Sequence, residues 1–265
     1  MRQFDVLIIG AGAVGNAIAR EISKKDMISV AVLEKEPDTA FGASGRNSGV
    51  LHAGFNNKPG SLMAKLCVRG SEGFEQEAEA LGISFKKTGK LVVARYVEDL
   101  ERLYQLKEQG ETNGVRELRL LDRDELERLT GYEAGAGALW SGMTGIFDPF
   151  QYTIALAEAA SARGTEFFFG RQATEIRVID EKQTDRRKHP SGRGFLITAE
   201  NLSTGQRETY RAGLLINSAG LSADVIDRMV GLNDYSIFPC RGEYHILEKK
   251  SKGLEFPVYP VPNER

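Results

Sequence analysis

The chain has 265 residues, of which 41% are hydrophobic and 27% are charged, close to the averages of globular proteins. This composition excludes collagen-like, coiled-coil and wholly disordered chains. Because 35 basic residues are balanced by 37 acidic ones, the net charge is −2, and nothing favours a nucleic acid or an anionic membrane surface as a partner.

The amino-terminal residues carry no targeting or membrane signal. Their apolar run ends at Gly10 and is too short for a secretory signal or a transmembrane helix. The two cysteines, Cys67 and Cys240, lie far apart and form no C-x-x-C pattern, which argues against a disulfide framework and a zinc site. We therefore expect a cytoplasmic protein without a bound metal or a membrane-spanning segment, and we leave association with a membrane surface open.

The first part of the chain predicts a strand–helix–strand unit. Residues 4–9 are apolar and rich in β-formers, residues 11–24 carry apolar side chains at helical spacing, and residues 30–34 form a second apolar run. Their combined length suits a βαβ unit with parallel strands. The next segment, 37–61, is rich in Gly, Ser and Asn and has no period, and long irregular segments of this kind are usually functional.

The rest of the chain alternates predicted helices and strands. Gly82 is expected to end a helix over 62–81, and Asp122 forms a capping box with Glu125. Asp148-Pro149 is a further helix-start signal. The remaining expectations are turns or irregular chain at 110–114, 131–147 and 180–194, helices at 97–108, 149–163 and 222–230, and strands at 88–94, 165–169, 174–179, 195–200, 208–215, 238–247 and 256–259.

A glycine fingerprint, G-x-G-x-x-G at residues 10–15, joins the first predicted strand to the first helix. Gly10 allows the tight turn, Gly12 lets the backbone approach a pyrophosphate, and Gly15 lets the helix pack on the strand. Glu34 ends the second strand, where its carboxylate can accept hydrogen bonds from an adenosine ribose and would repel the 2′-phosphate of NADP. The pattern predicts a dinucleotide site but does not separate FAD from NAD.

The loop that follows separates these two cofactors. An NAD-binding domain usually continues into another βαβ crossover, whereas this chain enters a Gly/Ser/Asn-rich loop at 42–54. The sequence G-A-S-G-R-N-S-G-V-L-H-A-G in this loop resembles the flavin-contacting loop of the D-amino-acid-oxidase-like FAD-dependent oxidoreductases. Together with K-P-G-S-L-M-A-K-L-C-V at 58–68, it looks like the L-2-hydroxyglutarate oxidase/dehydrogenase branch. N-S-A-G-L-S-A-D at 217–224 and R-G-E-Y at 241–244 are similar to further motifs of the same family, so the resemblance covers essentially the whole chain.

The resemblance implies FAD as the cofactor and suggests its contacts. The fingerprint glycines would hold the pyrophosphate and Glu34 the ribose, while the 42–54 loop would line the pyrophosphate and the flavin. The backbone near Ala173 would meet the adenine, and Ala219 with Gly220 would close over the ribityl–phosphate region. The expected cofactor-binding residues are Gly10, Gly12, Ala13, Val14, Gly15, Glu34, Lys35, Ser44, Gly45, Arg46, Asn47, Ser48, Ala173, Ala219 and Gly220.

The resemblance also implies the fold, an α/β architecture in which a Rossmann-like FAD-binding domain carries an inserted antiparallel-sheet substrate domain. We expect residues 1–83 and 147–236 in the FAD domain, and residues 84–146 and 237–265 in the substrate domain. In the family, the chain continues past the Y-P-V-P segment with more substrate-domain strands and a glycine-rich segment that returns to the flavin. This chain is therefore expected to be truncated at its carboxyl end.

Oxidation of a 2-hydroxy acid requires a hydride acceptor, a base for the hydroxyl proton and a cation for the carboxylate, and the flavin supplies the first. His52 suits the base because imidazole titrates near neutral pH, or else it bonds only the flavin or the backbone. Arg241 suits a carboxylate clamp, or else forms an ion pair. Tyr244 can donate a hydrogen bond to the substrate, or else packs in a strand.

The sequence thus predicts an FAD-dependent oxidoreductase that transfers a hydride from a small 2-hydroxy acid, L-2-hydroxyglutarate above all, to the flavin. Oxygen or a quinone would accept the electrons. Two alternatives stay open. One is an FAD-dependent dehydrogenase of glycerol 3-phosphate or of an amine or amino acid, and the other is a truncated FAD-binding fragment without activity.

Overall fold

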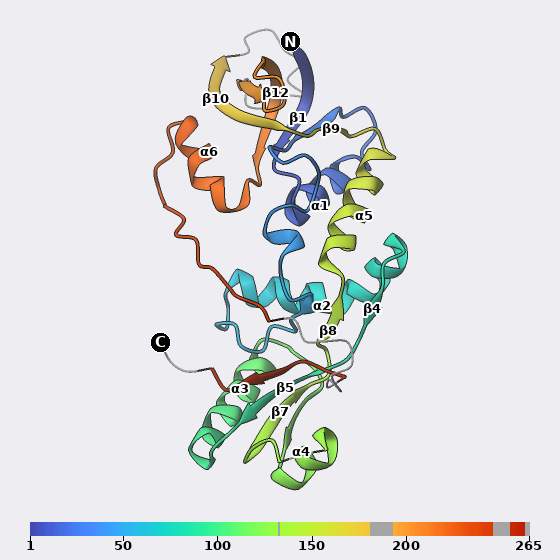
Figure 1. The fold of residues 1–265 in the computed structure, drawn as a ribbon, viewed down its shortest axis with the longest axis vertical. Helices are drawn as coiled ribbons and strands as arrows, with labels where there is room; N and C mark the ends of the chain where they lie inside the picture. The colour runs from blue at the N-terminus through green and yellow to red at the C-terminus, as the bar shows by residue number, and fades with distance from the viewer. Residues whose placement is uncertain (132, 181–192, 246–254, 263–265) are drawn as a thin grey trace. The chain divides into compact units, whose positions relative to one another are not determined.

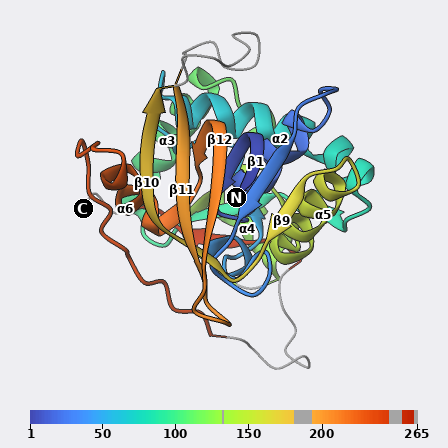
Figure 2. The ribbon, with the colours of Figure 1, turned by 90° about the horizontal axis from the view of Figure 1, so that it is seen from above.

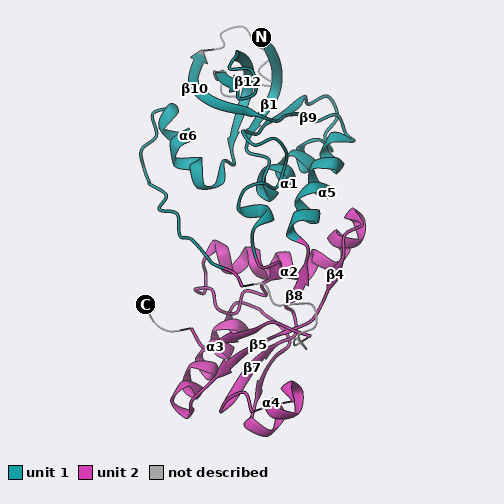
Figure 3. Cartoon of the chain, in the orientation of Figure 1, with its two compact units in different colours: residues 1–47, 149–243 teal, residues 48–148, 244–265 magenta. Residues whose placement is uncertain are grey.

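The computed structural model divides the chain into two compact units (Figure 3). Unit 1 comprises Met1–Asn47 and Pro149–Glu243, and unit 2 comprises Ser48–Asp148 and Tyr244–Arg265. Residues 48–83, which we expected in the FAD domain, group with unit 2. The structure describes residues 1–131, 133–180, 193–245 and 255–262.

A six-stranded sheet with the order β10-β11-β12-β1-β2-β9 forms the centre of unit 1, and Figure 2 shows the row of strands from β10 to β9. β1 pairs in parallel with β2 and β12, and β2 with β9, while β10 and β11 are antiparallel to their neighbours. The parallel β1–β2 pair confirms the predicted βαβ unit. The strands are β1 (Arg2–Ile9), β2 (Val30–Leu33), β9 (Glu166–Phe168), β10 (Arg171–Asp180), β11 (Arg193–Asn201) and β12 (Arg207–Asn217).

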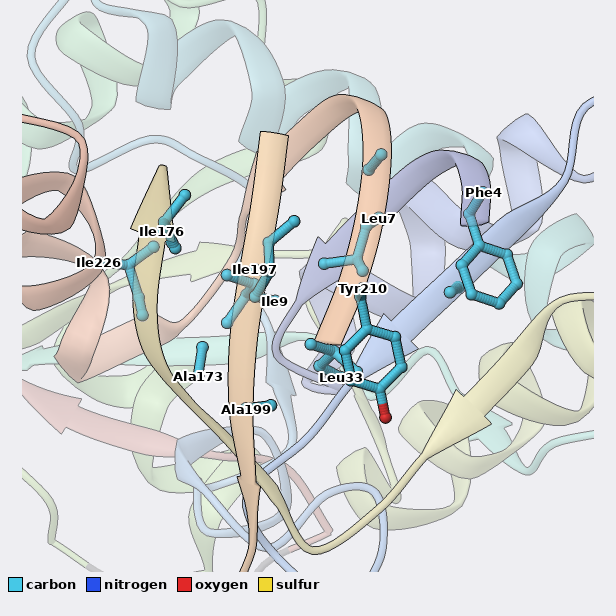
Figure 4. Packing of buried hydrophobic residues seen from close by; sticks show 12 residues of the cluster. Phe4, Leu7, Ile9, Leu33, Ala173, Ile176, Ile197, Ala199, Tyr210 and Ile226 are labelled. Atoms are coloured by element: carbon cyan, nitrogen blue, oxygen red, sulfur yellow. The ribbon is translucent and has the colours of Figure 1, made fainter. Parts of the chain in front are cut away.

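Alternate side chains of β1 enter two separate cores of unit 1. Val6 and Ile8 pack in a cluster that includes Ala19 of α1 and Ala160 of α5, two helices that contact each other. Leu7 and Ile9 enter the other cluster, shown in Figure 4, with side chains from β2, β10, β11, β12 and α6. This alternation is what a parallel strand covered on both faces requires. The helical elements of unit 1 are α1 (Ala13–Ile22), η1 (Ala43–Gly45), α5 (Pro149–Ser161), η3 (Gly220–Ser222) and α6 (Ala223–Met229) (Figure 1).

A buried asparagine on α1 connects three segments of unit 1. The Asn16 amide nitrogen donates to the Ala11 carbonyl at 3.1 Å, to the Thr39 hydroxyl at 2.7 Å and to the Thr153 carbonyl of α5 at 3.0 Å. Asn16 is fully buried, so water cannot replace these donations if the amide is removed.

Replacing Asn16 with alanine is therefore expected to lower the free energy of unfolding by about 2–3 kcal/mol, because buried acceptors lose their donor. Urea-induced unfolding followed by circular dichroism measures this loss. Asn233→Ala, at an exposed position of the same unit, is the matched control and is expected to change stability by less than about 0.5 kcal/mol. Equal effects of the two substitutions would contradict the structural role of the amide.

Unit 2 contains two small sheets, one in the order β13-β5-β7-β6 and one in the order β3-β8-β4. All their pairs are antiparallel except β13–β5, which is parallel. Val92 of β5 packs with Leu103 and Leu106 of α3, whereas Leu91 packs with Leu126 of α4, so the two helices cover opposite faces of the larger sheet. The elements are β3 (Val50–Leu51), α2 (Leu62–Leu81), β4 (Phe85–Lys86), β5 (Lys90–Ala94), η2 (Val97–Asp99), α3 (Leu100–Thr112), β6 (Leu118–Leu121), α4 (Arg123–Thr130), β7 (Gly137–Ser141), β8 (Gly145–Phe147) and β13 (Val258–Pro260).

The expected mixed α/β fold is confirmed, and several helix boundaries were predicted correctly. Gly82 is the left-handed C-cap of α2, with φ 65°. Asp122 and Glu125 form the expected capping box at the start of α4. Helix α5 begins at Pro149, as its start signal predicted.

Two predictions based on glycine were wrong in part, because Gly145 and Gly110 serve close packing rather than turns. The stretch 131–147 contains strands β7 and β8, and a Cβ on Gly145 would lie 2.3 Å from the Phe85 ring. Helix α3 continues to Thr112 through Gly110, where a Cβ would lie 2.6 Å from the Phe55 Cβ.

Two further expectations concern parts of the chain near the gaps. No strand occurs over 238–245, the described part of the strand expected at 238–247, and residues 246–247 lie outside the described residues. The loop expected at 180–194 falls largely outside them as well.

Candidate functional site

A cavity of about 340 Å³ opens in unit 1 where β1 and β12 end. Its wall combines the turn after Ile9 with the segment after Asn217, so two neighbouring parallel strands deliver their carboxyl ends to it. Ligands of open α/β sheets bind at such an edge. Nine of the expected cofactor-binding residues line the cavity, namely Gly10, Gly12, Val14, Glu34, Lys35, Ser44, Ala173, Ala219 and Gly220.

The three fingerprint glycines each prevent a steric clash in this turn. Gly10 has φ 105°, and a Cβ there would lie 2.4 Å from the Ser218 carbonyl oxygen. A Cβ on Gly15 would lie 2.0 Å from the Gly10 carbonyl oxygen, so α1 can approach β1 only with glycine at this position. A Cβ on Gly12 would meet the Ser44 hydroxyl at 2.9 Å. Gly10 and Gly12 border the cavity, whereas Gly15 and Ala13 do not line it.

The Glu34 carboxylate, directly after β2, stabilises the same turn by hydrogen bonds. Its Oε2 accepts a hydrogen bond from the Ala11 amide at 2.7 Å, and its Oε1 accepts one from the Glu36 amide at 3.0 Å. The carboxylate is thereby fixed at the wall of the cavity, with lone pairs left for a further donor. Lys35, the next residue, is exposed, and its ammonium lies 3.9 Å from the Glu36 carboxylate.

The loop around η1 contributes Ser44 to the cavity and uses its next residues to hold its own shape. The Ser44 hydroxyl accepts a hydrogen bond from the Ala13 amide at 2.9 Å, at the amino terminus of α1. The Arg46 guanidinium bonds the Phe41 carbonyl, and the Asn47 amide donates to the Ser44 carbonyl at 2.9 Å. Gly45, Arg46, Asn47 and Ser48 do not line the cavity, and Ser48 belongs to unit 2.

Two residues that sequence reasoning did not single out also shape the cavity. Ser218 donates from its hydroxyl to the carbonyls of Ile9 at 2.9 Å and Gly10 at 3.2 Å, which ties β12 to the glycine turn. Arg171 at the start of β10 is held by Glu208 at 3.1 Å. The N-S-A-G segment was a visible signal for Ser218, whereas no local pattern marked Arg171.

The features of the cavity fit FAD. The amino terminus of α1, a helix of ten residues, follows a turn in which Gly10 and Gly12 border the cavity without side chains, as binding of a pyrophosphate requires. The carboxylate of Glu34 offers acceptors for ribose hydroxyls, and apolar side chains such as Val14 and Met229 offer contact surface. FAD bound here would be held by the glycine turn, Glu34, Ser44 and the segment Ser218–Gly220.

The expected base, His52, lies in unit 2 directly after β3, among aromatic and cationic neighbours. Its ring contacts Tyr259 edge-on, with 6.4 Å between the ring centroids. Lys90 places its ammonium 4.7 Å from the centroid of the same tyrosine ring. Although solvent reaches His52, partial burial and then the charge of Lys90 lower its pKa from the ordinary value of an imidazole, which favours the neutral ring.

The other two expected catalytic residues lie at the surface. The Arg241 side chain is exposed and lies 3.6 Å from the Glu243 carboxylate, the ion pair that sequence reasoning left open as its alternative. Tyr244 is 66% exposed, in a segment without regular secondary structure. Arg241 belongs to unit 1, whereas Tyr244 belongs to unit 2 together with His52, Tyr259 and Lys90.

Three further features concern the thiols, possible metal ligands and membrane-spanning helices. Cys67 and Cys240 are free thiols. Within the described ranges, no three or more His, Cys, Asp and Glu side chains are grouped so as to hold a metal ion. None of the helices in the described part of the chain is sufficiently long and apolar to cross a membrane.

Comparisons with known proteins agree with this geometry. The family model for FAD dependent oxidoreductases, DAO, matches residues 5–265. The chain is 35% identical to a glycerol 3-phosphate dehydrogenase of Caloramator mitchellensis over 98% of its length, and 36% identical to the mitochondrial L-2-hydroxyglutarate dehydrogenase of Homo sapiens over 99%. It covers 51% and 56% of these two proteins, so it spans about half the length of the curated relatives it matches.

Solved structures place the fold in the same group. The dithionite-reduced L-alpha-glycerophosphate oxidase of Mycoplasma pneumoniae, with FAD bound, has a TM-score of 0.80 at 26% identity, covering 99% of this chain and 66% of that one. Glycine oxidase of Geobacillus kaustophilus has a TM-score of 0.73 at 24% identity, covering 88% and 59%, and this likeness concerns the fold alone. With its glycine-lined cavity and a family match across nearly its whole length, the chain belongs to the DAO family of FAD-dependent oxidoreductases.

Proposed function

We propose that this chain provides the FAD site and part of the substrate site of an oxidoreductase that oxidises L-2-hydroxyglutarate or a closely related 2-hydroxy acid. The observation that carries the proposal is the glycine-lined cavity with Glu34 at its wall, in a chain whose relatives include L-2-hydroxyglutarate dehydrogenases at about 35% identity. FAD in this cavity supplies the hydride acceptor.

In the proposed reaction, His52 is the base. The neutral imidazole accepts the proton of the substrate hydroxyl, while the hydrogen on the same carbon leaves with its electron pair as hydride, so the alcohol becomes a ketone. The lowered pKa of His52 supports this role because it favours the neutral ring, which has a free lone pair to accept the proton. Arg241 and Tyr244 stay proposed substrate contacts, each with an exposed side chain.

Glycerol 3-phosphate is the second candidate substrate. The Caloramator relative carries that activity in its name, and the Mycoplasma structure is named for the oxidation of the same compound. Its secondary alcohol would be oxidised by the same proton and hydride transfers. Amine and amino-acid substrates have weaker support, because the named oxidases and deaminases of amino acids are similar in fold alone, at 24% identity or less.

An anaerobic flavin experiment tests these alternatives. The purified protein is titrated with FAD, and the loaded protein is then mixed with L-2-hydroxyglutarate, glycerol 3-phosphate or glycine. Bleaching of the flavin absorbance by L-2-hydroxyglutarate is the expected result. Bleaching by glycerol 3-phosphate alone would make glycerol 3-phosphate the substrate in place of L-2-hydroxyglutarate. A protein that binds FAD but whose flavin is reduced by no hydroxy acid, polyol phosphate or amine would be an inactive FAD-binding fragment.

The electron acceptor and the cellular location also belong to this proposal. We propose oxygen or a quinone as acceptor, which oxygen consumption and quinone reduction after substrate addition distinguish. A cytoplasmic location is supported by the two free thiols, one of them exposed at Cys240, which suit a reducing compartment. Cell fractionation followed by detection of the chain with an antibody measures its location.

The Glu34 carboxylate gives a direct prediction for cofactor binding. Glu34→Gln is expected to raise the Kd for FAD about 10- to 100-fold, because a neutral amide cannot accept from both the Ala11 and Glu36 amides and is a weaker acceptor for ribose hydroxyls. Quenching of flavin fluorescence during titration measures the Kd. Glu158→Gln, at an exposed position of α5, is expected to leave it unchanged, and an unchanged Kd in Glu34→Gln would remove Glu34 from the site.

A further inference from the structure

Unit 2 buries a lysine that has no carboxylate partner among the described residues. Lys90 is the first residue of β5 and is only 3% exposed. Its ammonium lies over the faces of two aromatic rings, 4.5 Å from the centroid of Phe55 and 4.7 Å from that of Tyr259. Among the residues that the structure describes, no carboxylate forms an ion pair with this ammonium within 4 Å.

The two rings compensate only part of the cost of burying this charge. A cation–π contact contributes about 0.5–2 kcal/mol, whereas a buried ammonium without hydrogen-bonding partners loses several kcal/mol of hydration. Burial accordingly lowers the pKa of Lys90 to about 8, so the group is still mostly protonated at pH 7. A charged group in such low-dielectric surroundings attracts an anion far more strongly than a surface lysine does.

The position of the ammonium connects it with His52. Both Lys90 and His52 contact the ring of Tyr259: the ammonium lies over its face, and the imidazole ring is inclined to it by 63°. β13 pairs in parallel with β5, with Tyr259 opposite Val92, so the tyrosine side chain projects from the same sheet face as those of Lys90 and Val92. Because both groups contact the ring of Tyr259, an anionic group a short carbon chain away from a hydroxyl at His52 can approach the surroundings of Lys90.

We propose that Lys90 binds an anionic group of the substrate, the one separated by a short carbon chain from the hydroxyl that is oxidised. In L-2-hydroxyglutarate this group is the distal carboxylate, and in glycerol 3-phosphate it is the phosphate. The inference rests on the proposed function, and it assigns the site to 2-hydroxy compounds with an anionic end. Arg241 is not needed for this contact.

Binding of an unreactive dicarboxylate tests the assignment without turnover. Glutarate has no hydroxyl to oxidise, and butyrate is the matched probe without the distal carboxylate. In the FAD-loaded protein, glutarate is expected to bind at least tenfold more tightly than butyrate, measured by calorimetry. Lys90→Met, which keeps an unbranched side chain one atom shorter and removes the charge, is expected to abolish this preference and to leave butyrate binding within twofold.

Two controls separate binding from folding. Lys86→Met, at an exposed position of β4, is expected to keep the preference for glutarate. FAD affinity and the thermal unfolding midpoint show whether Lys90→Met is folded, and Lys90→Gln is the second variant if it is not. Glutarate binding that is unchanged in a folded Lys90 variant would overturn the inference, and so would equal binding of glutarate and butyrate to the unaltered protein.

The outcomes also distinguish this inference from the proposed function. If L-2-hydroxyglutarate bleaches the flavin and Lys90→Met still prefers glutarate, the reaction stands and the assignment of Lys90 fails. If glutarate binding depends on Lys90 and no hydroxy compound bleaches the flavin, the anion site stands and the reaction fails. Glycerol 3-phosphate in place of glutarate, with glycerol as its matched probe, shows whether a phosphate is the preferred anion.

Discussion

Gly15→Ala is expected to abolish FAD binding and to lower the free energy of unfolding by about 3 kcal/mol or more. The added Cβ would lie 2.0 Å from the Gly10 carbonyl oxygen and 2.6 Å from the Ser218 hydroxyl oxygen. The carbonyl belongs to the backbone of the glycine turn and cannot rotate away as a side chain does. Helix α1 must then move off β1, and its amino-terminal amides leave the cavity.

The chain offers a graded series for this test. Gly12→Ala places its Cβ 2.9 Å from the Ser44 hydroxyl, the end of a side chain that can rotate, so a smaller loss of FAD affinity is expected. Gly73→Ala is the control, since nothing lies within 4 Å of its Cβ inside α2, and alanine there is expected to stabilise by about 0.5–1 kcal/mol. Flavin absorbance after gel filtration and urea unfolding measure both effects. Wild-type FAD affinity in Gly15→Ala would refute the packing argument.

The cofactor cavity was predictable from sequence because its parts are local. A glycine turn, a helix start and an acid at the end of the next strand carry their own geometry in their spacing, and the structure places Gly10, Gly12 and Glu34 at one cavity. Loop residues were harder to place. Arg46 and Asn47 have the right chemistry for a phosphate, yet they bond carbonyls of their own loop.

Features that depend on distant packing were not predictable. Gly145 looks like a loop residue, and only the Phe85 ring against it explains why glycine occupies a strand. In the sequence, Lys90 looks like an ordinary lysine at the start of an apolar strand. Its burial depends on Phe55 and Tyr259, which lie far away in sequence. No periodicity marks such a lysine, because three separate segments create its surroundings.

His52→Gln is expected to lower kcat/KM for the hydroxy acid by about 10²- to 10⁴-fold, the usual contribution of a general base. Glutamine can still donate and accept hydrogen bonds but cannot take up a proton, so the substitution separates the two roles that His52 could have. The readout is the rate of anaerobic flavin bleaching at increasing substrate concentration. A loss of less than about threefold would make His52 a hydrogen-bonding residue only.

The pH dependence identifies the base independently of the size of this loss. Protonation inactivates a base, so kcat/KM should fall as the pH drops through the pKa of His52, which partial burial and Lys90 place below 6.5. The acid limb should therefore lie below pH 6.5, and it should disappear in His52→Gln. It should persist in His245→Gln, the control at an exposed histidine of the same unit. Because a positive charge near His52 disfavours its protonated form, Lys90→Met should move the acid limb to higher pH. An acid limb at the same pH in all of these variants would show that another group accepts the proton.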